Sequence, residues 1–190
     1  MYVKKYPVAI LRMKNNVLFR NFILLVILCS NLACDQLSKN IARDELRYDE
    51  QIKLLGDRLT LVKVENTGAF LSFGDSMPEG LRFLFLTLLP IVVLAAGVYY
   101  LFSNKYLPNT YAVGLCFVIG GGAGNVYDRL LHGSVTDFLH LDLGLFQTGV
   151  FNLADVSIML GMVLLFYQVI FKKTAGVTDQ DTVKPQADVL

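Results

Sequence analysis

Four long apolar runs alternate with polar segments along the 190-residue chain. A helix needs about 20 predominantly apolar residues to cross the hydrocarbon core of a bilayer. The pattern therefore predicts an all-α membrane protein, in which residues 1–190 form a single integral-membrane domain. The expected membrane-spanning helices cover about residues 20–38, 81–102, 110–131 and 151–171.

Residues 40–80 form the longest polar segment between these runs. The first part of this segment is rich in charged side chains and predicts a short surface helix, whereas the run Leu59–Val64 is typical of a β-strand. The turn signal Asn66-Thr67-Gly68 follows and favours a return strand. We therefore expect a short helix and a small sheet at the membrane surface, and we interpret residues 131–150 as an external loop.

Basic residues at the two ends of the chain indicate the orientation of the spans. Residues 1–20 contain five Lys or Arg and no acidic residue, and Lys172-Lys173 follows the last apolar run. Because the cytoplasmic flanks of membrane helices are enriched in Lys and Arg, we expect both termini inside and residues 40–80 outside. The polar residues 174–190 are interpreted as a disordered cytosolic tail.

Composition supports a membrane protein and narrows its chemistry. Hydrophobic residues make up 54% of the chain and charged residues 17%, and the mean hydropathy is +0.51. A net charge of +1 offers no excess of cations for neutralising phosphates, so we expect no nucleic-acid partner. The two histidines lack partners at metal-ligand spacing, so a metal site is not expected. The three cysteines lie inside apolar runs and predict buried, reduced thiols.

Two aspartates stand at the mouths of the last two predicted spans. Asp137 follows the third span, and Asp155 lies in the first turn of the fourth span on the same helix face as Asn152. An antiparallel pair of spans brings both carboxylates to the same membrane surface. Placing an acidic side chain next to the hydrocarbon core costs free energy, so two such residues at one place indicate a function. Two such groups in a partly dehydrated site cannot both ionise cheaply, so one holds a proton while the other accepts one from water. This arrangement can hydrolyse amide bonds.

A polar stripe on the third predicted span indicates a lined cavity near these acids. Gly121, Asn125 and Arg129 are spaced i, i+4 and i+8 and therefore share one helix face, with Asp128 beside them. An arginine and an amide above a bare glycine are not typical of a surface that faces lipid.

Asp35 and Lys39 form an i,i+4 pair of opposite charge at the outer end of the first predicted span. We interpret this pair, together with Asp128, as structural polar support. Two other functions remain open at this point. Intramembrane acids can act as a proton relay in a small transporter or channel. A lipid-anchored protein cut at Cys34 is the second alternative, since Asn31–Cys34 has features of a lipoprotein cleavage site.

Five short motifs follow one another along the chain: Asp35–Lys39, Asn66–Ala69, Gly121–Arg129, Gly133–Phe138 and Phe151–Asp155. In order and spacing they resemble the motifs of the bacterial lipoprotein signal peptidases, the signal peptidase II family. The resemblance covers about residues 20–171. It is more specific than any one motif, because all five motifs occur in the same order along the four predicted spans.

The resemblance implies an aspartic peptidase, multi-pass in the bacterial cytoplasmic membrane, whose active site faces the extracytoplasmic side. We take a monomer as the default. Such an enzyme cleaves a prolipoprotein before its diacylglyceryl-modified cysteine, in contact with membrane lipid and without a cofactor. The resemblance assigns the catalytic pair to Asp137 and Asp155, and it assigns Asn66 to the turn of an external β-cradle over the substrate. The positions that it implies along the site are Gly121, Asn125, Arg129 and Asn152.

The chain departs from the family pattern at two places near the expected substrate entrance. After the turn it has Ala69-Phe70-Leu71-Ser72 where the family commonly has Ala-Ala-Phe-Ser. Before Phe151 it has Gln147–Val150 in place of the usual aromatic-proline approach. We therefore expect a change in the shape of the cradle and in substrate preference that leaves the aspartate pair intact.

Overall fold

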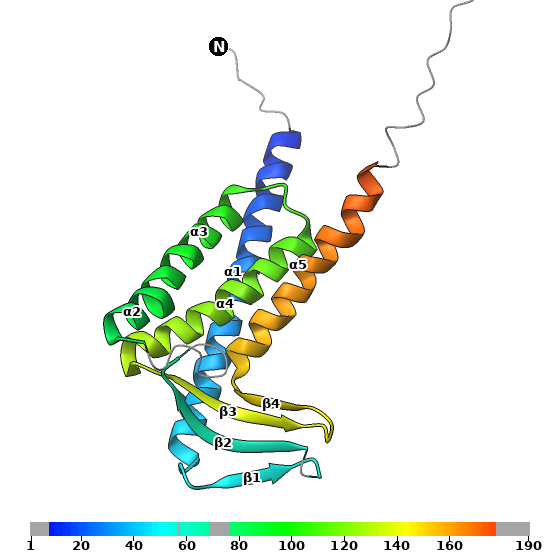
Figure 1. Ribbon diagram of the computed structural model, residues 1–190. Coiled ribbons are helices and arrows are strands. Elements are labelled where there is room, and N and C mark those ends of the chain that lie inside the picture. Colours follow the sequence, from blue (N-terminus) through cyan, green and yellow to red (C-terminus); the bar gives the residue numbers. More distant parts are fainter. Residues whose placement is uncertain (1–7, 57, 69–76, 178–190) are drawn as a thin grey trace, which may run out of the picture.

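The computed structural model describes residues 8–56, 58–68 and 77–177. Long helices run side by side in a bundle, and a small sheet lies at one end of it (Figure 1). In chain order the elements are α1 (Val8–Glu45), β1 (Gln51–Leu54), β2 (Leu59–Asn66), α2 (Glu79–Phe83), the π-helix η2 (Leu84–Leu88), α3 (Leu89–Ser103), α4 (Asn109–His132), β3 (Val135–Asp142), β4 (Gln147–Phe151) and α5 (Leu153–Val177).

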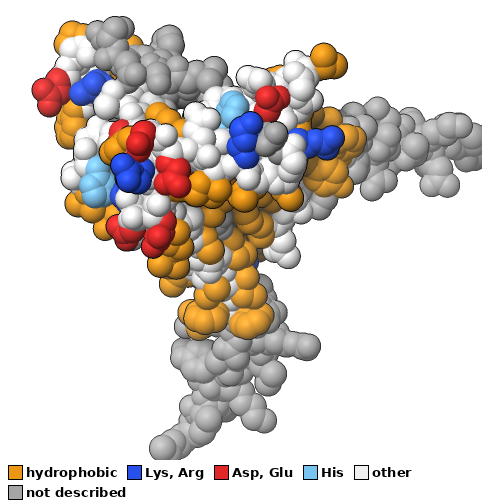
Figure 2. Space-filling view, turned by 90° about the horizontal axis from the view of Figure 1, so that it is seen from below, with side chains coloured by type: hydrophobic (Ala, Val, Ile, Leu, Met, Phe, Trp, Pro, Cys, Tyr) orange, Lys and Arg blue, Asp and Glu red, His pale blue; other side chains and the backbone are white. Residues whose placement is uncertain are grey.

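Three helical segments within the described residues are long and apolar enough to cross a membrane: Val17–Glu45, Glu79–Ser103 and Leu153–Phe171. Helix α4 has 24 residues and packs against α1, α3 and α5, but its glycines and polar stripe make it less apolar. Seen from the sheet end, charged side chains gather over the sheet and an apolar surface continues along the helices (Figure 2). A helical membrane protein with a small antiparallel sheet is confirmed, whereas a fourth span stays a prediction.

Helix α1 runs past the end of the apolar run without a break. The prediction of a separate short surface helix after residue 40 is wrong, because α1 continues to Glu45. Its last turn remains amphipathic: Ala42 and the following Leu46 are buried and belong to a cluster with Phe138 of β3. The end of α1 is therefore attached to the sheet rather than lying free on a surface.

The second helical segment changes its winding near its start. Residues Leu84–Leu88 form a π-helix between α2 and α3, immediately before Pro90 in the first turn of α3. Proline has no backbone N–H to donate, and a wider turn is one way for a helix to accommodate the missing hydrogen bond. At the other end of the chain, α5 reaches Val177, so the first residues of the predicted tail are helical. Residues 178–190 lie outside the described residues.

The sheet has four antiparallel strands in the order β1-β2-β3-β4. It confirms the expected small sheet, but the interpretation of residues 131–150 as a loop is wrong, because β3 and β4 form half of it. The first four residues of β3, Val135–Phe138, are all buried. Asn66 at the end of β2 pairs with Val135 at the start of β3. The predicted return strand after Gly68 falls mainly on residues 69–76, outside the described residues.

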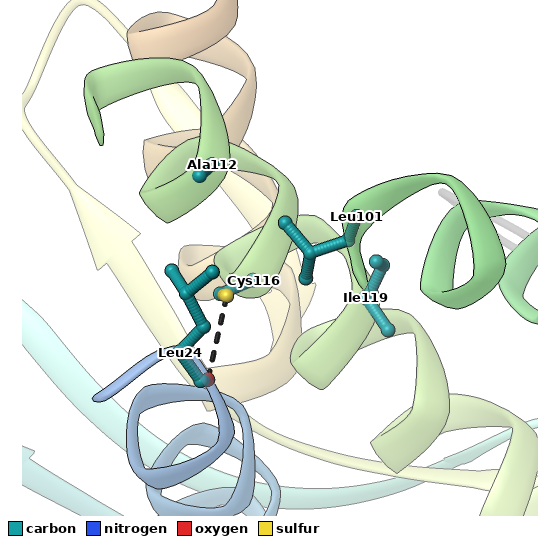
Figure 3. Packing of buried hydrophobic residues seen from close by; sticks show 5 residues of the cluster. All are labelled: Leu24, Leu101, Ala112, Cys116 and Ile119. Carbon is teal, nitrogen blue, oxygen red and sulfur yellow. Dashed lines mark hydrogen bonds between the residues drawn. The ribbon is translucent and has the colours of Figure 1, made fainter. Parts of the chain in front are cut away.

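Buried apolar side chains join α1, α3 and α4 at the end of the bundle opposite the sheet. Cys116 donates a hydrogen bond of 3.5 Å to the carbonyl oxygen of Leu24 (Figure 3). Cys29 and Cys34 are free thiols on exposed faces of α1, so the prediction of burial is right for Cys116 and wrong for the other two. The cluster consists of Leu24, Leu101, Ala112, Cys116 and Ile119.

Glycines let α4 and α5 approach each other closely. A Cβ atom on Gly161 would lie 2.6 Å from the carbonyl oxygen of Gly114 and 2.8 Å from the backbone nitrogen of Val118. These contacts involve backbone atoms, which cannot move aside as a flexible side chain can. The glycines of the third predicted span therefore serve close helix packing, as is common in membrane bundles.

We expect Gly161→Ala to destabilise the bundle by about 1–3 kcal/mol, because the added methyl group forces the two backbones apart. Gly80→Ala is the matched control, since a Cβ atom at Gly80 would have no neighbour within 4 Å. Alanine is also the better helix former, so this control should be neutral or stabilising. Thermal unfolding of both variants in the same detergent measures the difference. Equal midpoints for the two variants would show that the α4–α5 contact can relax.

Candidate active site

The two aspartates meet through one asparagine at the start of α5. Asn152 Nδ2 donates to Asp137 Oδ1 at 2.6 Å, and Asn152 N donates to Asp155 Oδ2 at 3.2 Å. In return, Asn152 Oδ1 accepts a hydrogen bond of 3.0 Å from Asp155 N. This reciprocal pairing across three residues is a capping box, which satisfies the free N–H groups at a helix start. The cap that begins α5 thus also fixes the position of Asp155 relative to Asp137.

The second oxygen of each carboxylate is held by another asparagine. Asn66 Nδ2 donates to Asp137 Oδ2 at 3.0 Å, and Asn125 Nδ2 donates to Asp155 Oδ1 at 2.9 Å. Asn125 Oδ1 accepts from Asn152 Nδ2 at 3.2 Å, which closes the arrangement. The sequence-predicted residues of the site therefore come together from β2, β3, α4 and the start of α5.

The two carboxylate groups differ in how deeply they are buried. Asp137 is 3% exposed, and removal from water raises its pKa to about 6, with the nearby Asp155 adding to the rise. The hydrogen bonds from Asn66 and Asn152 act in the opposite direction. Asp155 is only partly buried and lies in the first turn of α5, where the helix dipole favours a negative charge. Desolvation therefore favours the protonated form of Asp137.

Arg129 and Gly121 of the predicted polar stripe contact backbone atoms of neighbouring segments and do not form the hydrogen bonds to the carboxylates that are described above. Arg129 Nη2 donates to the carbonyl oxygen of Gly68 at 2.7 Å, while Gly68 N donates to Asn66 Oδ1 at 3.0 Å. Arg129 thus holds the turn that presents Asn66 to Asp137. At Gly121 a Cβ atom would collide with the carbonyl oxygen of Ala154, so this glycine lets the first turn of α5 lie against α4.

Behind the pair lies an ion cluster centred on the ammonium group of Lys39. Lys39 Nζ lies 2.8 Å from Asp35 Oδ2 and 3.0 Å from Asp128 Oδ2, and all three side chains are buried. The ammonium also donates to Asn125 Oδ1 at 2.9 Å. Asp35 Oδ1 accepts a hydrogen bond of 2.9 Å from Ala154 N. The predicted Asp35–Lys39 pair is therefore confirmed, and it supports both Asn125 and the start of α5.

Sequence reasoning missed the outer part of this cluster. Arg43 Nη2 lies 2.9 Å from Asp128 Oδ1, and Arg43 Nε donates to Thr136 Oγ1 at 2.8 Å. Thr136 in turn donates to Glu65 Oε1 at 2.8 Å. Gln36 Nε2 also reaches Asp128 Oδ1, at 3.1 Å. The spacing of Lys39 and Arg43 continues the i,i+4 series from Asp35, and this is the signal in the sequence that could have extended the cluster.

Comparison with known proteins decides the family. The family model described as signal peptidase (SPase) II matches residues 25–171. The chain belongs to the signal peptidase II family. It is therefore a peptidase.

Individual relatives agree with this assignment, and solved structures share the fold. A protein named lipoprotein signal peptidase from Azoarcus sp. (strain BH72) is 36% identical to this chain, over 75% of this chain and 80% of the relative. The protein of the same name from Moorella thermoacetica is also 36% identical, over 78% of this chain and 92% of the relative. The one from Pseudomonas aeruginosa (strain UCBPP-PA14) is also 36% identical, over 75% and 84%. Two bacterial membrane enzyme structures obtained by the in meso method, at 2.3 and 1.9 Å resolution, have TM-scores of 0.70, with 22% and 23% identity. The 2.3 Å structure matches 88% of this chain and 94% of its own chain, and the 1.9 Å structure matches 78% of this chain and 92% of its own chain. These matches show that the fold is shared.

The raised pKa of Asp137 makes the stability of this signal peptidase II member depend on pH. The folded chain keeps the proton up to about pH 6, whereas an unfolded chain releases it near the ordinary value of 3.8. The stabilisation is therefore present below about pH 4 and is lost as pH rises through about 6. We expect at most about 3 kcal/mol to be lost across this window.

Unfolding midpoints of the wild type and Asp137→Asn, measured in detergent from pH 4 to 7, test this linkage. The variant cannot titrate at this position, so its stability should fall less over the window. Asp49→Asn is the control, because the Asp49 side chain is 77% exposed and its removal should leave the wild-type slope. Parallel curves for the wild type and Asp137→Asn would contradict a proton held by this buried carboxyl group.

Removing the central cation of the ion cluster should be costly. We expect Lys39→Met to destabilise the peptidase by about 3–5 kcal/mol, because Asp35 and Asp128 are then buried without their shared partner. Arg47→Met is the control: Arg47 is 79% exposed and pairs with Asp49 at 3.4 Å, so the loss should stay below about 1 kcal/mol. Thermal unfolding in one detergent compares them, and similar losses for both variants would count against a structural role for the cluster.

Proposed function

We propose that this chain removes the signal peptide from prolipoproteins by hydrolysing the peptide bond before the diacylglyceryl-modified cysteine, with Asp137 and Asp155 as its catalytic pair. Membership of the signal peptidase II family supports lipoprotein signal-peptide processing. The names of the relatives point to the same substrates. The observation that carries the assignment of residues is the shared asparagine: Asn152 bonds to both carboxylates and so holds them at one place.

The proposed mechanism uses the different surroundings of the two acids. Asp155 accepts a proton from water as the water oxygen attacks the scissile carbonyl carbon, and Asp137 donates its proton to the carbonyl oxygen. When the tetrahedral intermediate collapses, the C–N bond breaks, Asp155 gives its proton to the leaving nitrogen, and Asp137 regains a proton from the hydroxyl group. The pair as a unit then carries the same single proton as before.

The asparagines have separate positioning roles in this proposal. Asn125 and Asn152 hold Asp155 so that one carboxylate edge can reach the water, and Asn66 holds Asp137 from the sheet side. Arg129 fixes the turn at Gly68, through which the sheet covers the site. Residues Ala69–Ser72 continue from this turn and lie outside the described residues, so their effect on substrate preference stays a prediction.

We further propose that α4 completes a set of four spans with both termini in the cytoplasm. The packing of α4 against α1, α3 and α5 supports its place in the membrane, as does the basic character of residues 1–20. In this orientation the sheet and the aspartate pair face the extracytoplasmic side of the bacterial inner membrane. We also propose a monomeric enzyme in contact with membrane lipid, because asparagines of this chain itself hold both carboxylates.

We expect Asp137→Asn and Asp155→Asn each to lower the rate of cleavage at least about 100-fold, because each variant removes a group that transfers a proton. The assay uses the purified full-length chain and a lipidated prolipoprotein, and mass spectrometry of the products locates the cleaved bond. Asp142→Asn is the matched control, since this acid lies on the same strand but bonds to Gly144 and Gln147. Wild-type rates from either folded dyad variant, or cleavage at another bond, would refute the proposal.

A further inference from the structure

A cavity lies at the end of the bundle that is far from the aspartate pair. Its volume is about 450 Å³, and it is formed by residues 19–24 of α1 and by the start of α4. Most of its lining is apolar, with one cation and one amide among the side chains. The lining residues are Phe19, Arg20, Ile23, Leu24, Asn109 and Val113.

The inner wall of this cavity is firmly packed, whereas its outer wall faces the surroundings of the bundle. Leu24 is 3% exposed and belongs to the buried cluster shown in Figure 3. Phe19 and Ile23 are 66% and 41% exposed on the surface of α1. In a bilayer such an apolar surface contacts acyl chains, so the cavity is accessible to lipid from the side of the helix bundle.

Arg20 supplies a cation that is poorly paired within the protein. Its Nη1 and Nη2 atoms donate to Asn21 Oδ1 and to the carbonyl oxygen of Asn104, both at the long distance of 3.4 Å. Its Nε atom is buried and has no hydrogen-bond partner. A guanidinium group has five N–H donors and its planar shape suits bidentate binding of a phosphate. Arg20 therefore has donors available for an anion.

Within the part of the chain that the structure describes, residues 8–34, 80–127 and 156–177 offer no acidic side chain that could serve as that anion. Residues 1–34 and 80–127 contain no Asp or Glu, and these ranges include the cavity-forming parts of α1 and α4. Residues 1–20 add further Lys and Arg at this end of the chain. Basic residues next to a membrane helix attract anionic lipid headgroups. The charge of this region therefore favours an anion that comes from outside the protein.

We propose that this cavity binds one anionic phospholipid, with the phosphate at Arg20 and Asn109 and an acyl chain against Phe19, Ile23 and Val113. The combination of a phosphate-binding cation and an apolar wall in one cavity fits a lipid better than a free ion. This lipid site is separate from the substrate site and does not depend on the proposed cleavage reaction. It gives the peptidase a preference for the anionic lipids of the leaflet at this end of the bundle.

Native mass spectrometry can measure this preference directly. The full-length chain is released from nanodiscs that contain equal amounts of phosphatidylcholine and phosphatidylglycerol, and the retained lipids are counted. We expect phosphatidylglycerol to be enriched about fivefold on the wild type, from one favourable arginine contact. Arg20→Gln should abolish the enrichment, and Val113→Phe, which fills the cavity without changing the charge, should lower the number of retained lipids.

Lys105→Gln is the matched control, because Lys105 is an exposed cation near the same end of the bundle and does not line the cavity. It should keep the wild-type enrichment. Circular dichroism confirms that each variant is folded, so the result does not rely on cleavage activity. Equal retention of the two lipids by the wild type, or equal loss in Lys105→Gln and Arg20→Gln, would overturn the proposal. Loss of the enrichment on addition of inorganic phosphate would instead assign the site to a free anion and also overturn it.

Discussion

The rest of the site depends on the contacts that the buried ammonium group of Lys39 makes. It lies between two carboxylates and an amide that come from α1 and α4, and through them it reaches the start of α5 and the strand β3. Burying the Lys39 ammonium group without partners would cost several kcal/mol. Each partner that neutralises this charge is therefore held in a defined position. The cluster therefore fixes how three helices and the sheet meet.

The aspartate pair inherits its geometry from this cluster. Asn125 accepts a hydrogen bond from Lys39 and donates one to Asp155, so the orientation of its amide group is determined from both sides. Asn152 caps α5 and reaches Asp137 with the same side chain. Little freedom is left to either carboxylate in the absence of substrate. Preorganised polar groups of this kind need no rearrangement at the moment of reaction, which is the main way in which enzymes lower electrostatic barriers.

The sequence was informative wherever one short segment determines its own structure. Apolar runs predicted the helical segments, and the spacing of Asp35 and Lys39 predicted an ion pair that the structure contains. The strand β3 was missed because its partner β2 lies about 70 residues earlier in the chain. The strand β4 was missed with it, because β4 pairs with β3. Glu65 was missed for the same reason, since its partner Thr136 is distant in sequence.

The end of α1 was missed because charged residues stop an apolar run without stopping a helix. Arg43 faces the ion cluster and Ala42 faces the sheet, so the helix continues on contacts that hydropathy does not record. The catalytic assignment came from the positions of the two acids at the ends of predicted spans and from the order of five motifs. That Asn152 bonds to both carboxylates could not be inferred from any one motif. Why Asn152 is an asparagine is clear only in three dimensions, where one side chain must both accept from a helix N–H group and donate to a carboxylate.

The positions of the two acids match the different roles that we propose for them. Asp137 lies on a strand, is almost completely buried and has a raised pKa, whereas Asp155 is more accessible and lies at the positive end of a helix dipole. Two carboxylates in identical surroundings would share a proton without preference. Here desolvation favours the acid form of Asp137, whereas Asp155 lies in the first turn of a helix, so the different surroundings support the division of labour that we propose.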